Sequence, residues 1–499
     1  MKLKQRTAYS LKRKLKSKEV VFFGAGKRLE NTCRDFKECG FENIISYVVD
    51  NNTSLWETKK KVGKIEIIIR SPEYLKKHIK KNTVIVISTD KYMPVYEQLQ
   101  GYDELKNTVI YKYPEIRYMC AGMWNWIFKI MPLKNTILFQ GEGDSCENAL
   151  ALFEYLEEHD LLNIYKVVWL CAHPDKFQNT RNVKYINRIS SLVDTNILKV
   201  WKYYYYRYTS RYLMYENRFI QKYREKQIGI YLKHGTFMIK NVKGKIVIPQ
   251  NVNHAICTSE NYADLAAEQE SIDKEKLLIC GSPRLDFLFK EKEVLKTLDI
   301  YKPEKKYIIW LPTMRQANFA NMRVDSAHTY PFGIPLMKTD KEFTVLDDRL
   351  GKLNIKLIIK PHPRQNLSVY KLEEYKNIIF IPQTKLDEYN YTVHSLMRET
   401  DALISDYSSI AFDYMLLDKP IAYTIDDMED YSIGFSVNDP LKYMPGEKLN
   451  TYSDMIKFIE AIGSGEDKYQ NERRKIKDYI HHYQDDKNCE RFLQLMKMI

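Results

Sequence analysis

The sequence predicts an α/β protein in which parallel sheets carry helices on both faces. Short apolar runs that end in polar residues recur along the chain, and helical patterns lie between them. This alternation is typical of parallel sheets whose strands are joined by crossover helices. A chain of 499 residues is too long for one hydrophobic core, so we expect two or three domains.

Composition argues against several classes of protein. The eight cysteines are spread along the chain without a CxxC pair, so we expect no zinc site, no disulfide framework and a reducing cytoplasm. No apolar run approaches the roughly 18 residues that a membrane span requires. The N-terminus also lacks the apolar segment of a signal peptide. We therefore expect a soluble or peripheral protein that is not secreted.

The formal net charge of +13 is partly concentrated in two segments. Residues 1–18 form a basic tail without acids, and residues 201–226 interleave lysines and arginines with tyrosines and a tryptophan. Such segments bind nucleic acid, lie on an anionic membrane, or form ordinary solvated surface. No familiar nucleic-acid-binding motif is present. We therefore expect no nucleic acid and favour the membrane over it, while ordinary surface stays open.

Residues 19–115 predict a small Rossmann-like domain. “EVVFFGAG” (19–26) indicates a strand and a glycine-rich turn, a second strand ends at Asp50, and “VIVISTD” (84–90) indicates a third. Leu29 stands where the third glycine of a GxGxxG fingerprint would follow Gly24 and Gly26, so the fingerprint is incomplete. Asp50 is well placed for a ribose. A scaffold or another nucleotide pocket nevertheless fits better than a dehydrogenase.

Two further α/β units are predicted after a connector near residues 100–134. The connector contains “MWNWIF” (123–128), which we expect to be buried packing rather than a membrane anchor. Strands of the first unit are expected at “NTILFQ”, “YKVVWLCAH”, “IGIYLKHGT” and “HAICTSE”. Strands of the second are expected at “YIIWLPTMR”, “IKLIIKPHP”, “ALISDYSS” and “PIAYTID”.

Four of these strands end in residues suited to an anionic ligand. Open α/β sheets bind ligands beyond the carboxyl ends of their strands, so these four turns are expected to converge. A lone histidine or arginine at a strand end is usually structural, but four such ends in consecutive units favour a binding site. The candidates are His234, Gly235 and Thr236, then Thr313 and Arg315, then Lys360, His362 and Arg364, and finally Asp406, Ser408 and Ser409.

Ser408 and Ser409 stand where a predicted helix begins. Free N–H groups and the positive end of the helix dipole favour an anion at such a place. Plain N-capping is the alternative, although capping needs only one serine. We therefore expect a phosphate at this pair. Asp413, in the first turns of the same helix, is either a dipole-favoured surface residue or a ribose ligand.

Five motifs together resemble the CDP-glycerol glycerophosphotransferase family in order and spacing. They are “YLKHGT”, “GSPRLDFL”, “IIWLPTMR”, “IIKPHP” and “LISDYSSIAFDYMLLDKPIAY”, and the resemblance covers roughly residues 135–465. It implies a GT-B-like pair of Rossmann-like domains that face a cleft. The acceptor-side domain would span 116–295 and the CDP-donor-binding domain 296–499, preceded by the extra N-terminal domain at 19–115.

The resemblance also implies roles for the candidate residues. His234 and His362 would be the catalytic histidines, with His234 as the general base. Arg315, Ser408 and Ser409 would join His362 in binding the donor diphosphate. The remaining candidates, Gly235, Thr236, Thr313, Lys360, Asp406 and Asp413, are expected to bind substrate, with Asp413 at the ribose.

The implied reaction moves glycerol phosphate or ribitol phosphate from CDP-glycerol or CDP-ribitol to a hydroxyl group and releases CMP. The acceptor would be a lipid-linked glycan of teichoic acid or capsule assembly. The enzyme would act on the cytoplasmic face of the cell membrane, without a metal or cofactor. Two alternatives are a GT-B glycosyltransferase that uses a nucleotide sugar and a non-catalytic, nucleotide-responsive scaffold of a membrane assembly complex.

Two positions leave questions open within this resemblance. Arg284 either borders the cleft or pairs with Asp286, and the pairing is slightly favoured. Phe237 stands where the family commonly has a proline after “HGT”, so the acceptor-side loop is expected to differ.

Overall fold

The structure is a computed structural model. It describes most of the chain in the ranges 18–26, 45–62, 65–89, 92–112, 127–140, 147–188, 197–220, 222–236, 238–246, 248–249, 251–313, 330–362 and 375–499, together with Leu3–Gln5, Leu15 and Leu29. The chain divides into two compact units. The N-terminal unit comprises residues 1–133 and 186–209, and the C-terminal unit comprises residues 134–185 and 210–499. The domain boundaries expected at 115 and 295 stay predictions.

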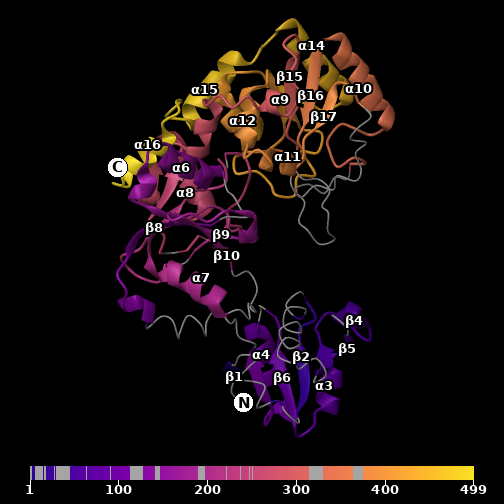
Figure 1. Ribbon diagram of the computed structural model, residues 1–499. Coiled ribbons are helices and arrows are strands. Elements are labelled where there is room, and N and C mark those ends of the chain that lie inside the picture. The colour runs from indigo at the N-terminus through magenta and orange to yellow at the C-terminus, as the bar shows by residue number, and fades with distance from the viewer. Residues whose placement is uncertain are drawn as a thin grey trace. The chain divides into compact units, whose positions relative to one another are not determined.

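The N-terminal unit contains a seven-stranded sheet of order β1-β7-β6-β2-β3-β5-β4 (Figure 1). Its pairings are parallel except that β4 runs antiparallel to β5. The strands are β1 Leu3–Gln5, β2 Glu19–Phe23, β3 Ile45–Val49, β4 Lys59–Val62, β5 Ile65–Arg70, β6 Thr83–Ile87 and β7 Val109–Lys112, and the helices include α3 Pro72–His78 and α4 Tyr92–Gln100. Strand β1 lies within the basic tail, so part of that tail belongs to the sheet.

Asp50 holds the glycine-rich turn of this unit. Its two carboxylate oxygens accept hydrogen bonds from the backbone N–H groups of Ala25, at 2.6 Å, and Asn52, at 2.8 Å. Gly24 adopts a φ of 113°, a conformation that glycine enters without strain. These contacts give Asp50 a structural role in the turn. Nucleotide binding here stays a prediction.

The basic, aromatic segment is shared between the two units. Helix α7 (Ile197–Thr209) belongs to the N-terminal unit and buries Tyr203, Tyr204 and Tyr208. Strand β11 (Ser210–Tyr215) belongs to the C-terminal unit. Of the aromatic cluster at 123–128, residues 123–126 lie outside the described residues. Phe128 is buried and its ring centroid lies 5.9 Å from that of Trp201, as the packing interpretation predicted for it.

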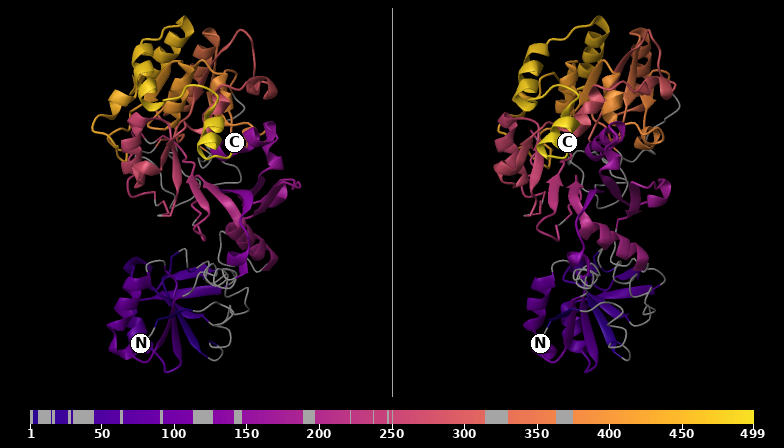
Figure 2. Two further views of the ribbon diagram at one scale, coloured as in Figure 1. Left: turned by 90° about the vertical axis from the view of Figure 1, so that its left-hand side faces the viewer. Right: turned by 60° about the vertical axis from the view of Figure 1, so that its left-hand side comes forward.

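The C-terminal unit contains two sheets (Figures 1 and 2). The first has the order β10-β9-β8-β11-β12-β13-β14, and the second has the order β17-β16-β15-β18-β19-β20. The first comprises β8 Lys134–Gln140, β9 Lys166–Cys171, β10 Val183–Asn187, β11, β12 Ile228–Tyr231, β13 His254–Cys257 and β14 Leu277–Ile279. The second comprises β15 Lys306–Trp310, β16 Ile355–Ile359, β17 Ile378–Phe380, β18 Ala402–Ser405, β19 Ile421–Thr424 and β20 Glu447–Leu449.

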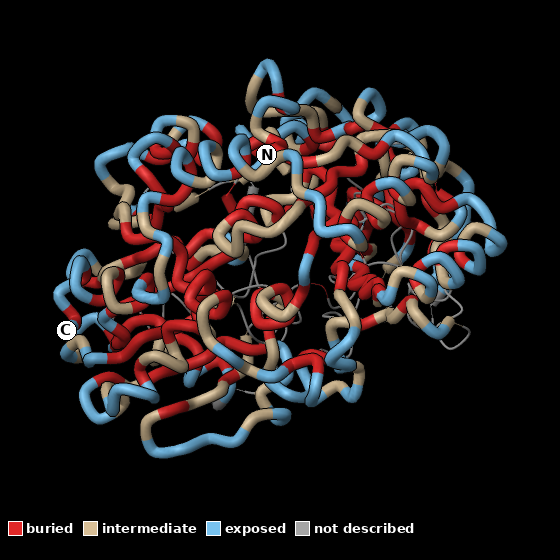
Figure 3. Tube along the Cα trace, turned by 90° about the horizontal axis from the view of Figure 1, so that it is seen from above, coloured by how far each residue is buried: buried red, intermediate tan, exposed pale blue. Residues whose placement is uncertain are grey.

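Parallel pairing joins β9, β8, β11, β12, β13 and β14 in that order, and it joins all strands of the second sheet. Buried residues follow these strands, and exposed residues lie mainly on the outer helices and turns (Figure 3). All eight strands predicted for this part of the chain are present, as β8, β9, β12, β13, β15, β16, β18 and β19. The prediction of an α/β fold with several parallel, Rossmann-like sheets is therefore confirmed.

Helix α16 (Asn488–Leu495) returns from the end of the chain to the first sheet, beside α6 (Glu147–Glu158; Figure 1). Phe492 and Leu493 join the core under that sheet. The start of α16 is held by Asp286 in η6 (Pro283–Leu288), whose carboxylate accepts hydrogen bonds from the Asn488 and Cys489 backbone N–H groups and from Asn488 Nδ2, at 2.7–2.9 Å. Asp286 is therefore not the partner of Arg284, and that prediction was wrong.

Replacing Asp286 should weaken the whole C-terminal unit. Asp286→Ala would leave buried N–H groups of α16 without acceptors, so we expect a loss of roughly 2–4 kcal/mol in the free energy of unfolding. Denaturant titration monitored by circular dichroism measures this loss. Asp264→Ala, which removes an exposed partner of Lys274, is the control and should change stability by less than about 0.5 kcal/mol. Equal effects of the two variants would contradict the anchoring role.

Candidate active site

The candidate residues follow the carboxyl ends of four strands in the C-terminal unit. His234, Gly235 and Thr236 come after β12, and Thr313 comes after β15. Lys360 and His362 come after β16, and Asp406, Ser408 and Ser409 come after β18. Arg315 and Arg364 lie outside the described residues, and so does Phe237.

The turn that carries His234 touches the turn that carries Ser409. Gly235 approaches Ser409 so closely that a Cβ atom on the glycine would overlap Ser409 Oγ and lie 3.0 Å from Ser409 Cβ. The two sheets of the C-terminal unit therefore bring these two strand ends together. Contact at this distance requires a glycine at position 235.

Arg284 connects the same two turns through hydrogen bonds. The guanidinium donates from Nε and Nη2 to Asp413 Oδ2, at 3.1 and 2.8 Å, and from Nη1 to the backbone carbonyl of His234. Both Arg284 and Asp413 are buried, with Asp413 fully covered. Arg284 thus borders the site and its acidic partner is Asp413. The interpretation of Asp413 as a dipole-favoured surface residue was therefore wrong.

A histidine also contacts Asp413. His394 in α12 (Val393–Arg398) places Nε2 2.9 Å from Asp413 Oδ2 and Nδ1 3.4 Å from Glu147 Oε2. Burial raises the pKa of Asp413, but Arg284 and His394 outweigh it and hold that pKa below its ordinary value. Asp413 Oδ2 thus accepts hydrogen bonds from Arg284 and His394. The predicted contact of Asp413 with a ribose stays a prediction.

Asn148 fixes the backbone immediately before His234. Its side-chain amide donates to the carbonyls of Leu232, at 2.8 Å, and Lys233, at 3.2 Å. Its Oδ1 accepts from Ser282 Oγ, at 2.8 Å, and from the Arg284 backbone N–H, at 3.0 Å. One buried amide therefore links α6, the His234 turn and the Arg284 segment. Sequence reasoning missed Asn148 because nothing local distinguishes it from a helical surface residue.

Lys233 also constrains the turn. Its backbone has a φ of 54°, which is uncommon for a residue with a side chain. Its ammonium lies 2.8 Å from Glu270 Oε2, and both groups are buried. This ion pair from α8 (Glu260–Glu270) holds the left-handed residue that precedes His234.

His234 has the electrostatics of a neutral base. Its side chain is exposed at the surface of the turn, while surrounding protein atoms and the nearby Arg284 cation lower its pKa from 6.5 to about 4. Water at the exposed side weakens this effect, and the pKa of His234 stays below its ordinary value. Asn217 places Nδ2 3.3 Å from His234 Nδ1, a neighbour that orients the ring and that sequence reasoning missed.

Asp406 organises the neighbouring turn after β15. Its Oδ2 accepts hydrogen bonds from the Thr313 backbone N–H, at 2.8 Å, and from Thr313 Oγ1, at 2.7 Å. Asp406 is fully buried. The contact joins the strand ends of β15 and β18, two of the four that were expected to converge.

Lys360 is a buried cation without an acidic partner at ion-pair distance among the described residues. Burial lowers its pKa, while the carboxylates of Glu147 and Asp387 act in the opposite direction. A buried ammonium in this state favours an anionic ligand. His362 follows two residues later and is exposed.

Ser409 precedes helix α13 (Ile410–Tyr414) without capping it through its side chain. Its hydroxyl group therefore does not serve as an N-cap. Ser408 makes a contact of 3.5 Å to the Ile410 backbone N–H, at the outer limit for a hydrogen bond. Both serines are half-buried. Plain capping thus does not account for the pair.

The comparison with protein families decides the classification. The model of the family described as CDP-Glycerol:Poly(glycerophosphate) glycerophosphotransferase matches residues 124–497. The chain belongs to this family. The resemblance inferred from the motifs is confirmed.

Relatives within the glycerophosphotransferase family include two polymerases of Bacillus spizizenii. The chain is 31% identical over 245 residues to a teichoic acid poly(ribitol-phosphate) polymerase, a match that covers 48% of this chain but only 35% of the relative. It is 27% identical over 409 residues to a teichoic acid poly(glycerol phosphate) polymerase, covering 74% of this chain and 93% of the relative. The first match thus reaches about a third of that polymerase.

Solved structures of the wall teichoic acid polymerase TagF share the fold. One has a TM-score of 0.58 at 19% identity and covers 77% of this chain and 96% of TagF. A TagF variant soaked with CDPG has a TM-score of 0.56 at 19% identity, covering 77% of this chain and 94% of that chain.

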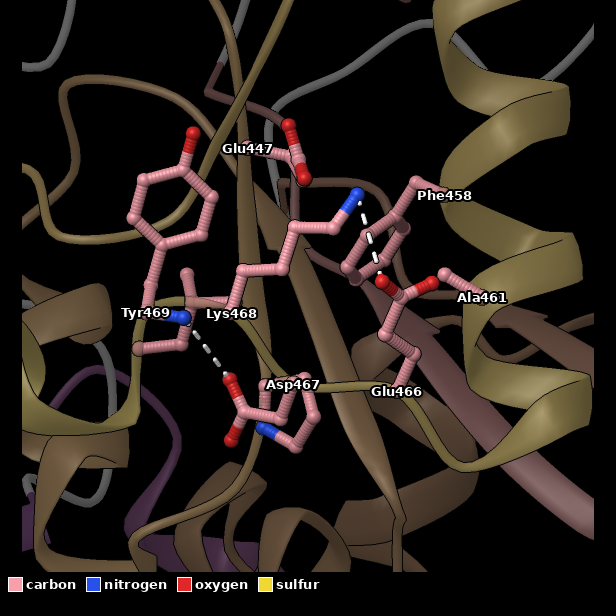
Figure 4. Close-up of a pocket in the computed structure, with 9 residues that line it drawn as sticks. Glu447, Phe458, Ala461, Glu466, Asp467, Lys468 and Tyr469 are labelled. Atoms are coloured by element: carbon pink, nitrogen blue, oxygen red, sulfur yellow. Dashed lines mark hydrogen bonds and ion pairs between the residues drawn. The ribbon is translucent and has the colours of Figure 1, made fainter.

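A surface pocket elsewhere in the C-terminal unit shares no residue with the site (Figure 4). It lies at the amino ends of β19 and β20, beside α14 (Tyr452–Ser464), whereas the candidate residues follow carboxyl ends. Lys468 pairs there with Glu466, at 3.3 Å. Within the described ranges, no group of three or more His, Cys, Asp or Glu side chains is arranged to hold a metal ion.

Gly235→Ala should force the two turns apart. The added methyl group would collide with Ser409, so we expect a loss of about 1–3 kcal/mol in the free energy of unfolding. When Ser409 is also replaced by glycine, Gly235→Ala should lower the free energy of unfolding much less, because the obstructing side chain is absent. A double-mutant cycle from denaturant unfolding measures the difference. Additive effects would show that the two turns do not touch.

Proposed function

We propose that this protein transfers glycerol phosphate or ribitol phosphate from a CDP-linked donor to a hydroxyl group and releases CMP. The close approach of Gly235 to Ser409 carries the proposal, because it brings a candidate base beside a candidate diphosphate site. Family membership and the names of the relatives support the same reaction.

His234 acts as the general base in this mechanism. A neutral imidazole takes the proton from the acceptor hydroxyl as its oxygen attacks the polyol-bearing phosphorus. The new P–O bond forms while the bond from that phosphorus to the oxygen of CMP breaks, and CMP leaves. The lowered pKa of His234 keeps the ring neutral, and therefore able to accept a proton, at neutral pH.

The donor diphosphate is held on the opposite side. Phosphoryl transfer requires alignment and neutralisation of charge more than covalent help from the protein. Ser408 and Ser409 supply hydroxyl donors and Lys360 supplies a cation, while Thr313 and Asp406 shape the adjoining turn. Arg315 and His362 complete the predicted set. No cofactor enters this mechanism.

The two sheets of the C-terminal unit form the proposed GT-B pair. The sheet that bears His234 takes the acceptor side, and the sheet that bears Ser409 takes the CDP-donor side. The acceptor is a lipid-linked glycan in teichoic acid or capsule assembly. The relatives include both ribitol-phosphate and glycerol-phosphate polymerases, so both CDP-polyols remain candidate donors.

Purified protein should release CMP from CDP-glycerol or CDP-ribitol when a lipid-linked acceptor is present. His234→Ala should reduce kcat by at least about a hundredfold, because the proton of the acceptor hydroxyl would lose its base. Thermal unfolding provides the control that the variant is folded. Full activity of this variant would remove His234 from the chemistry.

The pH profile tests the same assignment independently. Because the pKa of His234 lies below 6.5, the acid limb of kcat/KM should fall near pH 4 to 5, with little loss at pH 6. An acid limb at pH 6.5 or above would mean that another group supplies the base.

The proposed location is the inner face of the cell membrane. Among the residues that the structure describes, no helix is long and apolar enough to cross a membrane. Residues 127–130, which are helical, adjoin α7 and expose Ile127 (40%), Ile130 (76%) and Trp201 (38%). The exposed Lys129 and Lys202 flank them. Exposed apolar side chains next to exposed lysines in the sequence suit an anionic lipid surface.

Vesicles containing anionic lipid should retain the protein in a sedimentation assay. Ile130→Asp should weaken this binding roughly tenfold, because it removes the most exposed apolar side chain of the face. Ile164→Asp replaces an exposed isoleucine outside this face and serves as the control. Unchanged retention of Ile130→Asp would exclude this face as the contact.

A further inference from the structure

We propose that His394 is a positioning residue that locks the Ser409 turn to the His234 turn through a buried chain of charges. The chain runs from Glu147 through His394, Asp413 and Arg284 to the backbone carbonyl of His234. This role rests on the proposed function of the site, and it assigns to His394 no contact with either substrate.

Four separate elements contribute to the chain. Glu147 begins α6, His394 lies in α12, Asp413 lies in α13 and Arg284 lies in η6. The side chains of His394 and Asp413 are fully covered, and that of Arg284 is 5% exposed. The side chain of Glu147 is 34% exposed at the end of the chain, whereas the three inner charges are shielded from water and therefore require internal compensation.

The geometry makes His394 the link between two carboxylates. Nε2 lies 2.9 Å from Asp413 Oδ2, and Nδ1 lies 3.4 Å from Glu147 Oε2. The Nε2 contact is a hydrogen bond, whereas the Nδ1 contact is an ion pair without hydrogen-bond geometry, and the two carboxylates on either side of the ring favour the charged imidazolium. With His394 charged, two acids are balanced by two bases within the chain.

The electrostatics agree with that assignment. Burial lowers the pKa of His394, but the carboxylates of Glu147 and Asp413 outweigh burial and raise the pKa above its ordinary value. The pKa of Glu147 is lowered, because His394 outweighs the effect of burial on it. The pKa values of the two histidines thus shift in opposite directions, since the pKa of His234 is lowered.

The consequence for His234 follows from Arg284. That guanidinium divides its N–H groups between Asp413 and the carbonyl of His234, so its orientation depends on Asp413. Asp413 in turn stands four residues after Ser409 in the chain. Loss of the His394 charge would leave an excess negative charge in this buried chain and turn Arg284 toward Asp413.

His481 provides a matched control. It is also buried against α13 and places Nε2 2.9 Å from the Phe412 carbonyl, but it is not part of the chain to His234. Burial is the largest effect on His481 and lowers its pKa, the opposite direction from His394. Replacing either histidine removes a buried ring that contacts α13.

Thermal unfolding of the full chain between pH 5.5 and 9 tests the charged contact. A raised pKa stabilises the fold fully below about pH 6.5, and this stabilisation is lost as pH rises through the folded-state value. The melting-temperature deficit of His394→Gln should therefore be greatest at acid pH and narrow at alkaline pH. The deficit of His481→Gln should instead narrow as pH falls below 6.5. A pH-independent deficit for His394→Gln would overturn the proposal.

Kinetics test the positioning role. His394→Gln should lower kcat for CMP release by about ten- to a hundredfold with a smaller change in the KM for the CDP-polyol, because a displaced base slows chemistry more than binding. His481→Gln should keep kcat within about threefold at temperatures below its melting point. Equal kcat values for the two variants would overturn the role of His394. Absence of CMP release by the unaltered protein would overturn the proposed function itself, and the opposite pH trends would then decide the His394 contact alone.

Discussion

The buried pair of Arg284 and Asp413 holds the active-site half of this protein together. The two residues are separated by 129 positions, yet the guanidinium donates twice to one carboxylate oxygen and once more to the carbonyl of His234. Burying such a pair costs free energy. Removing only one of the two partners costs more, because the remaining charge would stay unsolvated. Everything that places Gly235 against Ser409 depends on this contact being complete.

The polar groups around this pair have distinct tasks. Asn148 and the Lys233–Glu270 pair shape the backbone before His234, while Asp406 shapes the turn at Thr313. Within the described residues, Lys360 is buried after β16 and has no acidic partner at ion-pair distance. These buried polar groups thus serve mainly to hold the backbone of the site rigid, and few of them are left to contact a ligand. Such preorganisation suits phosphoryl transfer, in which alignment supplies much of the catalysis.

The central strands and the candidate turns could be predicted from sequence, because each combines a buried apolar run with polar residues directly after it. Strands β14, β17 and β20 were not predicted, because a strand of three residues is too short to show a recognisable apolar pattern in the sequence. Strand β11 was hidden within a segment notable for its charge and tyrosines. The partner of Arg284 was missed because proximity in sequence suggested Asp286, whereas the fold supplies Asp413. Asn148, Glu147 and His394 carry no local signal, since their contacts form only when distant helices meet.

The return of α16 to the first sheet has a consequence for synthesis of the chain. The core beneath β8 and β9 includes Phe492 and Leu493, so that sheet cannot finish packing until residues near 490 have left the ribosome. More than three hundred residues are translated between β8 and α16, and during that time α16 does not yet cover one apolar face of the first sheet. During that interval the nascent chain exposes apolar surface, which favours aggregation.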